Sequence, residues 1–216
     1  MKNERETRER LLVSGKKEFL KKGYLHASLR DICKNAQLTT GALYFFFENK
    51  EALFASIVEQ PLNELQEIMN QHHRHELEQL KCTQTHMEDY LEHYEIAKKV
   101  IRRMYYYYDE FQLLLTKAQG SRFEQMVDQF VEITEKKYRV LADATTVQKK
   151  APKVEDYMLH WFTHTQVNLF VHMITHEASE ETAMMHLEAM VHCLVACWYQ
   201  LFQQNTDFVV GERNHG

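Results

Sequence analysis

Glycine and proline are scarce in this chain, and this scarcity constrains its fold more than any other feature. The 216 residues include six glycines and two prolines, Pro61 and Pro152. An all-β sandwich or a series of strand–helix units needs more turn-forming residues than these. Because 44% of the residues are apolar, the chain can also build a sizeable core. We therefore expect an all-α globular protein.

Apolar residues recur at helical spacing along most of the chain. Ser28, Thr39 and Asn49 stand where helix N-caps belong, and Gly23 stands where a helix C-cap belongs. We expect breaks at Gly120, in the segment TTVQKKAPK and in the segment HEAS. The predicted helices are residues 5–22, a short stretch after Ser28, 39–46, 50–71, 84–104, 105–118, 120–143, 155–176 and 179–204.

Charge is unevenly distributed along the chain. Residues 1–54 hold 11 Lys and Arg against 7 Asp and Glu, whereas residues 55–216 hold 15 against 24. The basic N-terminal end is therefore the candidate for nucleic-acid binding, although a solvated basic helix face would have the same composition.

Nothing in the sequence indicates export or a membrane span. The charged N-terminus has no apolar segment of the kind found in signal peptides, and the four cysteines follow no disulfide spacing. Residues 157–176 and 189–206 carry no charged side chain, but they contain His, Gln, Asn or Thr at intervals that a bilayer span rarely tolerates. We expect a cytoplasmic protein with no membrane partner.

The segment LTTGALYFFFENK, residues 38–50, holds four consecutive aromatic residues. Successive residues of an α-helix point about 100° apart, so the four rings cannot all face one core. On a helix that begins at Thr39, Leu43 and Phe47 lie one turn apart and can pack on the first helix, which leaves the other three rings facing outward. With the short helix and four-residue turn before it, this segment predicts a helix-turn-helix, in which one helix enters the major groove of DNA.

Residues 7–54 resemble the DNA-binding domain of TetR/AcrR-type repressors. The landmarks are Phe19, Gly23, Tyr24, Ser28, Ile32, Ala36, the run TTGALY at 39–44, Phe47 and the run NKEAL at 49–53. The resemblance implies an all-α fold with an N-terminal three-helix helix-turn-helix DNA-binding domain and a C-terminal helical ligand-binding and dimerisation domain. We place the first at residues 1–54, with its recognition motif at about 28–47, and the second at residues 55–216.

The same resemblance implies which residues contact DNA. Ser28 and the start of its helix would meet a phosphate, as helix N-termini do. Tyr44 and Lys50 would contact further phosphates, and Thr40 would offer a hydroxyl or methyl group to a base. The predicted DNA-binding residues are Ser28, Arg30, Thr39, Thr40, Gly41, Ala42, Tyr44, Phe45, Phe46 and Lys50.

Three positions depart from the family pattern. Many members carry glycine where this chain has Gln37, so the turn either holds a side chain at positive φ, at a cost of about 1–2 kcal/mol, or takes another shape. Phe46 stands where histidine is common, and Glu48 stands where a basic residue is common. Each of these two changes removes a phosphate contact.

Two expectations concern the C-terminal part. Its charge-free runs are longer than the core of one chain requires, and burial against the same runs of a second copy would form a four-helix interface, although packing within one chain uses the same residue types. The predicted dimer interface is Leu187, Val191, Leu194, Val195, Trp198 and Leu201. Because the family usually holds a ligand in this domain, we also expect a small-molecule effector, in a pocket lined by Tyr105, Tyr108, Phe111, Tyr157, Trp161 and His164. Aromatic rings at this spacing are more often core residues.

Histidines support an alternative, a metal-responsive regulator with His and Cys ligands. The candidate ligands are His72, His73, His75, His160, His164, His172, His176, Cys193 and Cys197. A four-residue step drifts about 40° per turn on a helix, so the four histidines between 160 and 176 cannot all meet one ion. We predict no metal and no cofactor.

The function that we expect is DNA binding without catalysis. The sequence has no Gly-rich phosphate loop, H-E-x-x-H or G-x-S-x-G motif, so we do not expect an enzyme. We expect a homodimeric transcriptional regulator, a repressor that a small molecule releases from a palindromic operator. A helical protein-interaction module that lacks DNA binding is the other alternative, because exposed aromatic residues also mark protein interfaces.

Overall fold

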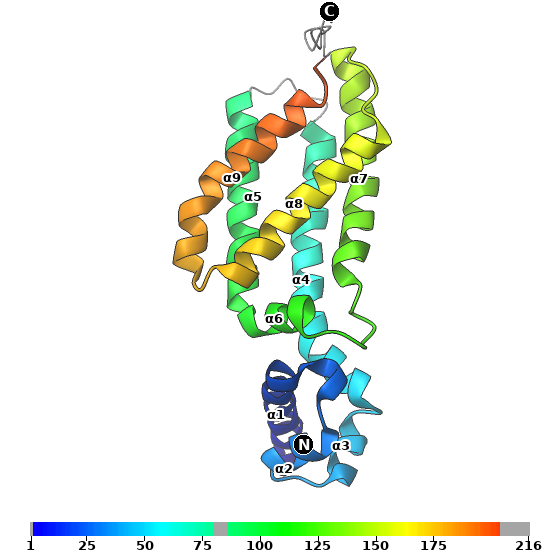
Figure 1. Cartoon of the computed structure of the whole chain (residues 1–216), viewed down its shortest axis with the longest axis vertical. Coiled ribbons are helices and arrows are strands. Elements are labelled where there is room, and N and C mark those ends of the chain that lie inside the picture. Colours follow the sequence, from blue (N-terminus) through cyan, green and yellow to red (C-terminus); the bar gives the residue numbers. More distant parts are fainter. Residues whose placement is uncertain (1, 80–85, 204–216) are drawn as a thin grey trace, which may run out of the picture.

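The computed structural model describes residues 2–79 and 86–203, and within these residues every regular element is a helix (Figure 1). The all-α prediction is therefore confirmed for the described part of the chain. The helices are α1 Lys2–His26, α2 Leu29–Asn35, α3 Thr40–Phe46, α4 Lys50–Gln79, α5 His86–Tyr106, α6 Tyr108–Thr116, α7 Met126–Lys149, α8 Asp156–His176 and α9 Glu180–Gln200. The ends of two predicted helices, residues 84–85 and 204, lie outside the described residues.

Three predicted boundaries are wrong by six residues or more. Helix α4 continues through the buried Pro61 to Gln79 instead of ending near residue 71. Helix α7 begins at Met126, not at Gly120, because the chain first makes a set of tight turns in which Gly120 has φ 83°. It then continues to Lys149, because the segment that we read as a break still buries Thr145 against the core.

The first three helices and the start of α4 form a small head at one end of the molecule (Figure 1). Its core contains a cluster of three rings, in which Phe54 lies 5.0 Å from Phe19 and 5.2 Å from Tyr24 between ring centroids. Gly23 interrupts α1 at φ 74°, so the chain turns back there and carries Tyr24 into this cluster. This cluster packs the start of α4 against α1.

The body consists of α4, α5 and α7 along the long axis, with α8 and α9 crossing them obliquely (Figure 1). Helix α9 packs along α5, and α8 packs on α7 and α9. No helix in the described part of the chain combines the length and the apolar character needed to cross a membrane.

Three of the six residues predicted for the dimer interface are buried in the core of their own chain. Leu187, Val191 and Val195 are 0%, 4% and 9% exposed and face a cluster that includes residues of α5. The ring of Trp198 lies 5.4 Å from both Tyr138 and Phe162. Leu194 and Leu201 are also partly buried within the chain.

The head and the body meet where α1 ends. The Tyr24 backbone N–H donates to the Lys117 carbonyl at 2.8 Å, just after α6. The Lys16 ammonium on α1 lies 2.9 Å from the Glu110 carboxylate on α6. Helix α4 begins in the head and continues through the body, so the predicted domain boundary between residues 54 and 55 falls inside one helix.

Candidate nucleic-acid interface

Side-chain caps set the first turns of the two short helices. The Ser28 hydroxyl accepts a hydrogen bond from the Asp31 backbone N–H at 3.3 Å, and the Thr39 hydroxyl accepts one from the Ala42 N–H at 3.1 Å. Both capping predictions are confirmed. Because each cap is the residue directly before its helix, the sequence alone decides where α2 and α3 begin.

The turn between α2 and α3 holds Gln37 at φ 54°, in the left-handed region. Its backbone N–H donates to Lys34 and the next N–H, of Leu38, donates to Cys33, so the turn keeps its hydrogen bonds. Of the two alternatives for this position, positive φ with a side chain is the one that the structure adopts.

Helix α3 has an inner and an outer face, as the aromatic run predicted. Leu43 and Phe47 are 0% and 3% exposed and belong to the core of the head, whereas Tyr44 and Phe45 are 57% and 72% exposed. Phe46 differs from the prediction, because it is partly buried against that core. Its ring stacks edge-on against Phe45 at 4.9 Å and so supports the exposed ring from behind.

The start of α3 offers backbone at the surface. Thr39, Thr40 and Gly41 are exposed. A Cβ built on Gly41 would meet only the Thr39 hydroxyl oxygen, at 3.8 Å, and Gly41 does not have positive φ. The fold therefore does not require glycine here. A partner that approaches the helix backbone closely would require glycine at this position.

Lys50 is placed differently from the prediction. Its ammonium donates to the carbonyls of Tyr24 at 2.8 Å, Leu25 at 3.2 Å and Ala27 at 3.4 Å, and it lies 4.6 Å from the centroid of the Tyr24 ring. An ammonium has three N–H donors, and here all three face carbonyls within the protein. Lys50 thus ties the start of α4 to the end of α1, and its ammonium is not available for the predicted phosphate contact.

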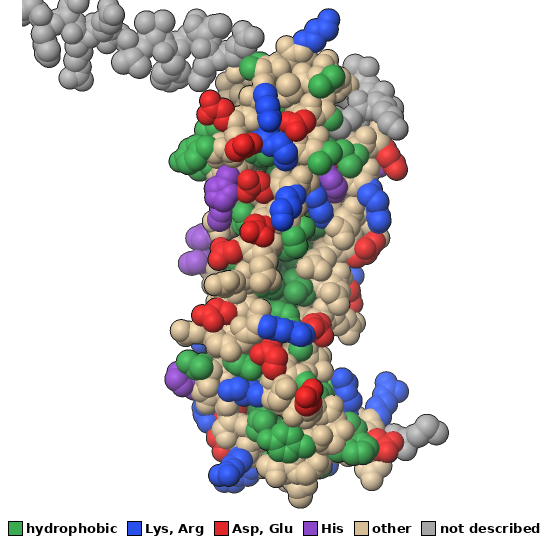
Figure 2. Space-filling view, turned by 90° about the vertical axis from the view of Figure 1, so that its right-hand side faces the viewer, with side chains coloured by type: hydrophobic (Ala, Val, Ile, Leu, Met, Phe, Trp, Pro, Cys, Tyr) green, Lys and Arg blue, Asp and Glu red, His purple; other side chains and the backbone are tan. Residues whose placement is uncertain are grey.

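Basic side chains surround the same end of the molecule. Figure 2 shows Lys and Arg around its lower end, with apolar side chains between them. Arg30, on the first turn of α2, is exposed. Lys22 is paired within the head, 2.7 Å from Glu18 and 2.9 Å from Asp31, and this hydrogen bond and charge lower the pKa of the Asp31 carboxyl.

A cavity of about 60 Å³ lies between α4, α5, α6, α7 and α8, above the head, and opens partly to solvent. Its lining is almost wholly apolar and includes Leu65, Met104, Phe111 and Phe130; Gln166 adds one of few polar groups. The apolar lining with few polar groups is typical of small-molecule sites.

Five of the six predicted pocket residues do not line this cavity. Phe111 does, but the Tyr105 hydroxyl instead donates to the carbonyls of Met173 and Glu177, which joins α5 to the end of α8. Tyr157 and Trp161 are 73% and 45% exposed on the outer face of α8. The remaining two, Tyr108 and His164, are partly buried elsewhere.

The outer faces of α8 and α9 carry exposed apolar side chains among polar ones. Tyr157, Met158 and Trp161 on α8 are exposed, and so is Met185 on α9, at 74%. Ala189, Cys193 and Ala196 continue the exposed face of α9. Exposed large apolar side chains that lie near one another mark interaction surfaces, so these faces are candidates for contact with a second copy.

The histidines form separate groups. On α8, His160 and His164 lie 4.5 Å apart between ring centroids, and His172 and His176 lie 4.2 Å apart. A third group, His72, Glu76 and His93, joins α4 to α5 and places one donor atom of each residue within 4.8 Å of the others. Sequence reasoning named only His72 of these three. The four-residue spacing of His72 and Glu76 was a usable signal, but the approach of α5 was not visible.

Protonation in this third group follows from burial. Burial lowers the pKa of the His72 imidazole, although the Glu76 carboxylate acts against that effect. Burial by itself would raise the pKa of the Glu76 carboxyl, but the neighbouring imidazoles of His73, His93 and His72 lower it to about 2. Glu76 is therefore an anion at neutral pH.

Comparison with known sequences agrees with the geometry of the head. Residues 11–57 match the sequence profile of the bacterial regulatory proteins of the tetR family. The HTH-type transcriptional repressor BepR of Brucella suis biovar 1 (strain 1330) is 39% identical over 66 residues, which cover 31% of this chain and 32% of BepR. The chain thus matches about a third of the length of this relative.

Solved structures extend the likeness to the body. A transcriptional regulator (TerR/AcrR family) from Aquifex aeolicus VF5 has a TM-score of 0.57 at 20% identity, over 87% of this chain and 99% of that chain. The transcriptional regulator FadR from Bacillus subtilis, in complex with stearoyl-CoA, has a TM-score of 0.52 at 11% identity, over 87% and 97% of the two chains. At these identities the likeness is one of fold.

Proposed function

We propose that this chain, which belongs to the TetR/AcrR family, is a DNA-binding transcriptional regulator that acts as a repressor. The outer face of α3 carries the proposal: small residues at its start, with exposed Tyr44 and Phe45 one turn later. A groove-reading helix needs small side chains where its backbone approaches base edges and larger ones where it meets sugar and phosphate. BepR is named a repressor, which supports the direction of control.

In this proposal each residue of the head has a distinct task. Thr40 and the backbone at Gly41 face the base edges, and Tyr44 donates its hydroxyl to a phosphate while Phe45 packs on the sugars. Arg30 adds a charge contact from α2. Ser28, Thr39 and Ala42 set the start of each helix, Phe46 supports Phe45, and Lys50 holds α4 to α1 without touching DNA.

The active form that we propose is a homodimer in the cytoplasm. Proteins of this family bind operator DNA as dimers. The exposed apolar faces of α8 and α9, with Trp161 and Met185, support a contact between copies there. A two-fold dimer places two α3 helices about 34–36 Å apart and reads a palindromic operator with half-sites one helical turn apart.

The cavity supports a small-molecule effector with a large apolar part. FadR was solved with stearoyl-CoA, a ligand of that kind. Phe111 and Leu115 of α6 line the cavity, and the Lys117 carbonyl just after α6 accepts a hydrogen bond from the Tyr24 backbone N–H near the end of α1. A ligand that moves α6 therefore also moves α1. A ligand that prefers the conformer with widely spaced heads weakens operator binding by its differential affinity for the two conformers.

The test is selection of DNA from a random-sequence pool with the purified full chain, followed by footprinting of the selected sequence. We expect two protected half-sites one turn apart and an affinity that falls steeply with salt. Tyr44→Ala should weaken binding by roughly tenfold or more, since a phosphate and groove contact of this kind contributes about 1–3 kcal/mol. Enrichment of no sequence, with weak and salt-independent binding, would favour the protein-interaction alternative instead.

A further inference from the structure

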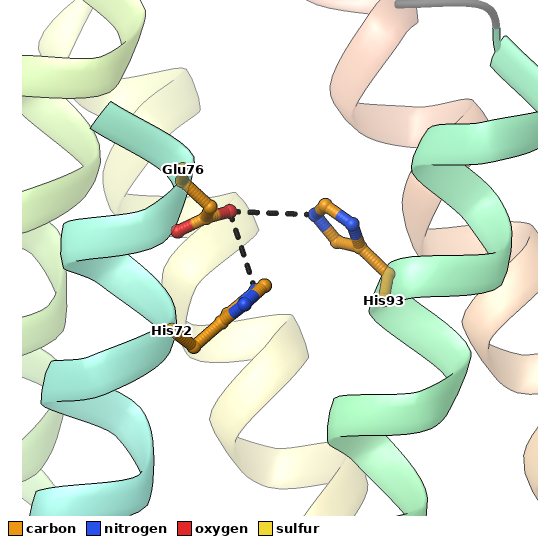
Figure 3. Close-up of side chains that lie close together, drawn as sticks. All are labelled: His72, Glu76 and His93. Carbon is orange, nitrogen blue, oxygen red and sulfur yellow. Dashed lines mark ion pairs between the residues drawn. The ribbon is translucent and has the colours of Figure 1, made fainter. Parts of the chain in front are cut away.

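Three potential metal ligands converge between the last turns of α4 and the first turns of α5 (Figure 3). His72 and Glu76 lie one turn apart on α4, and His93 reaches across from α5. The Nε2 atoms of both histidines face the same carboxylate oxygen, Glu76 Oε1, at 3.5 Å from His72 and 3.4 Å from His93. The three side chains are 11%, 15% and 25% exposed, so the group is largely shielded from water.

These distances fit the coordination sphere of a transition metal. Imidazole nitrogen and carboxylate oxygen bind Zn²⁺ at about 2.0–2.2 Å, so neighbouring ligand atoms of a tetrahedral site lie about 3.3–3.6 Å apart. Both measured edges to Glu76 Oε1 fall in that range. The rings of His72 and His93 stand at 85° to each other, with centroids 5.2 Å apart, so their nitrogens approach the shared position from different directions.

Two further features suit an ion at this position. Outside the three ligands, Glu92 Oε1 lies 3.9 Å from His72 Nδ1 and 3.2 Å from His75 Nε2, so an outer carboxylate stands next to the ligating imidazole. The group also borders a cavity lined by polar side chains that include Asn70, Lys137 and Tyr138. A water or a donor atom of a small molecule can complete the coordination from there.

We propose that His72, Glu76 and His93 bind a divalent transition-metal ion, for which Zn²⁺ is the probe, and that the ion ties α4 to α5. Two imidazoles and one carboxylate form a ligand set that Zn²⁺ accepts with a fourth position open. The site does not use the paired histidines of α8. It is independent of the proposed DNA binding, so it can be tested on the protein alone.

The experiment uses the full chain after treatment with a chelator, titrated with Zn²⁺ in a calorimeter and with Co²⁺ in a spectrophotometer. We expect one ion per chain at this site, with the strong visible absorption that Co²⁺ shows in four-coordinate surroundings. Saturation should also raise the melting temperature, because the ion binds the folded state and not the unfolded one. Loss of one ligand should lower the affinity at least about 100-fold, since even outer-shell changes cost 10–100-fold.

Two variants on different helices carry the test, so the folding of either one is not decisive. His93→Gln on α5 and His72→Gln on α4 should each lose the high-affinity binding, the Co²⁺ absorption and the metal-dependent rise in melting temperature. The matched control is His172→Gln, which removes one histidine of the α8 pair and should keep all three signals. Binding that persists in both variants, or that disappears in His172→Gln, overturns the proposal. So does wild-type protein that binds no Zn²⁺ in the micromolar range.

Discussion

Gly41 has no role in the fold that a glycine alone could fill, because its surroundings are open and its φ is not positive. We therefore predict that Gly41→Ala leaves the stability unchanged or raises it by up to about 1 kcal/mol, as alanine does in place of glycine in a helix. The added methyl group should weaken DNA binding by roughly tenfold, because it separates α3 from the base edges. Thermal unfolding and fluorescence anisotropy on the selected operator measure the two effects.

The control for this prediction is Gly120→Ala. At Gly120 an added Cβ would lie 2.9 Å from a side-chain carbon of Leu25, and φ is 83°, so alanine should destabilise the fold there. If Gly41→Ala left operator affinity unchanged, α3 would not approach DNA through its first turn.

Gln37 stores strain in the turn before α3, since it holds a side chain at φ 54°. Gln37→Gly should relieve a left-handed conformation that costs about 1–2 kcal/mol, offset in part by the larger entropy that glycine has in the unfolded chain. We expect the free energy of unfolding to rise by up to about 1 kcal/mol in urea denaturation. A loss of stability would show that the Gln37 side chain makes a compensating contact in solution.

Single residues were predictable where their task is local. The caps at Ser28 and Thr39 and the two faces of α3 follow from spacing along one short segment. The role of Lys50 was not predictable, because its partners are backbone carbonyls of residues 24–27, which only the fold brings near. No side-chain pattern in the sequence predicts a hydrogen bond to backbone carbonyls that are distant along the chain.

At the scale of elements, variants of Lys50 and Arg30 distinguish a residue that stabilises the head from one that binds DNA. Lys50→Met leaves three carbonyls at the end of α1 without their charged donor, and we expect a loss of about 1–3 kcal/mol in stability. The salt dependence of DNA binding should stay as in the wild type. Arg30→Ala should leave the stability nearly unchanged. It should reduce the slope of log affinity against log salt concentration by about 1.

Denaturation and a salt series of operator affinity measure both variants. If the fully folded Lys50→Met variant showed a reduced salt slope, Lys50 would be a phosphate contact, in contradiction to the structure. An unchanged slope in Arg30→Ala would mean that the first turn of α2 does not reach the DNA backbone.

Helix positions were largely predictable, but the faces of α8 and α9 were not. Amphipathic helices reveal their inner side by periodicity, whereas α8 and α9 carry few charged residues, so their sequence does not say which face meets α5 and which is exposed. The same limit applies to the cavity. Its lining residues, such as Leu65 and Met104, have the spacing and chemistry of ordinary core residues.

For the whole molecule, the proposed contact between two copies involves the exposed face of α8. Trp161 is 45% exposed and stands among apolar neighbours that include Tyr157 and Met158. Across a two-fold axis, Trp161→Glu would bring two carboxylates into an apolar contact, and like charges in that position cost several kcal/mol. We predict a folded monomer in light scattering coupled to gel filtration.

The matched control is Val13→Glu, which alters an apolar residue that is 43% exposed on α1, a helix of the head that packs on α2, α3, α4 and α6. This variant should remain dimeric, because it adds the same charge to a different surface. If Trp161→Glu gives monomers, the affinity of this variant for a single half-site should match that of one wild-type head. The added affinity of the wild type for the full palindrome should be lost, because each copy then binds alone. A Trp161→Glu protein that stays dimeric would place the contact between copies on another surface.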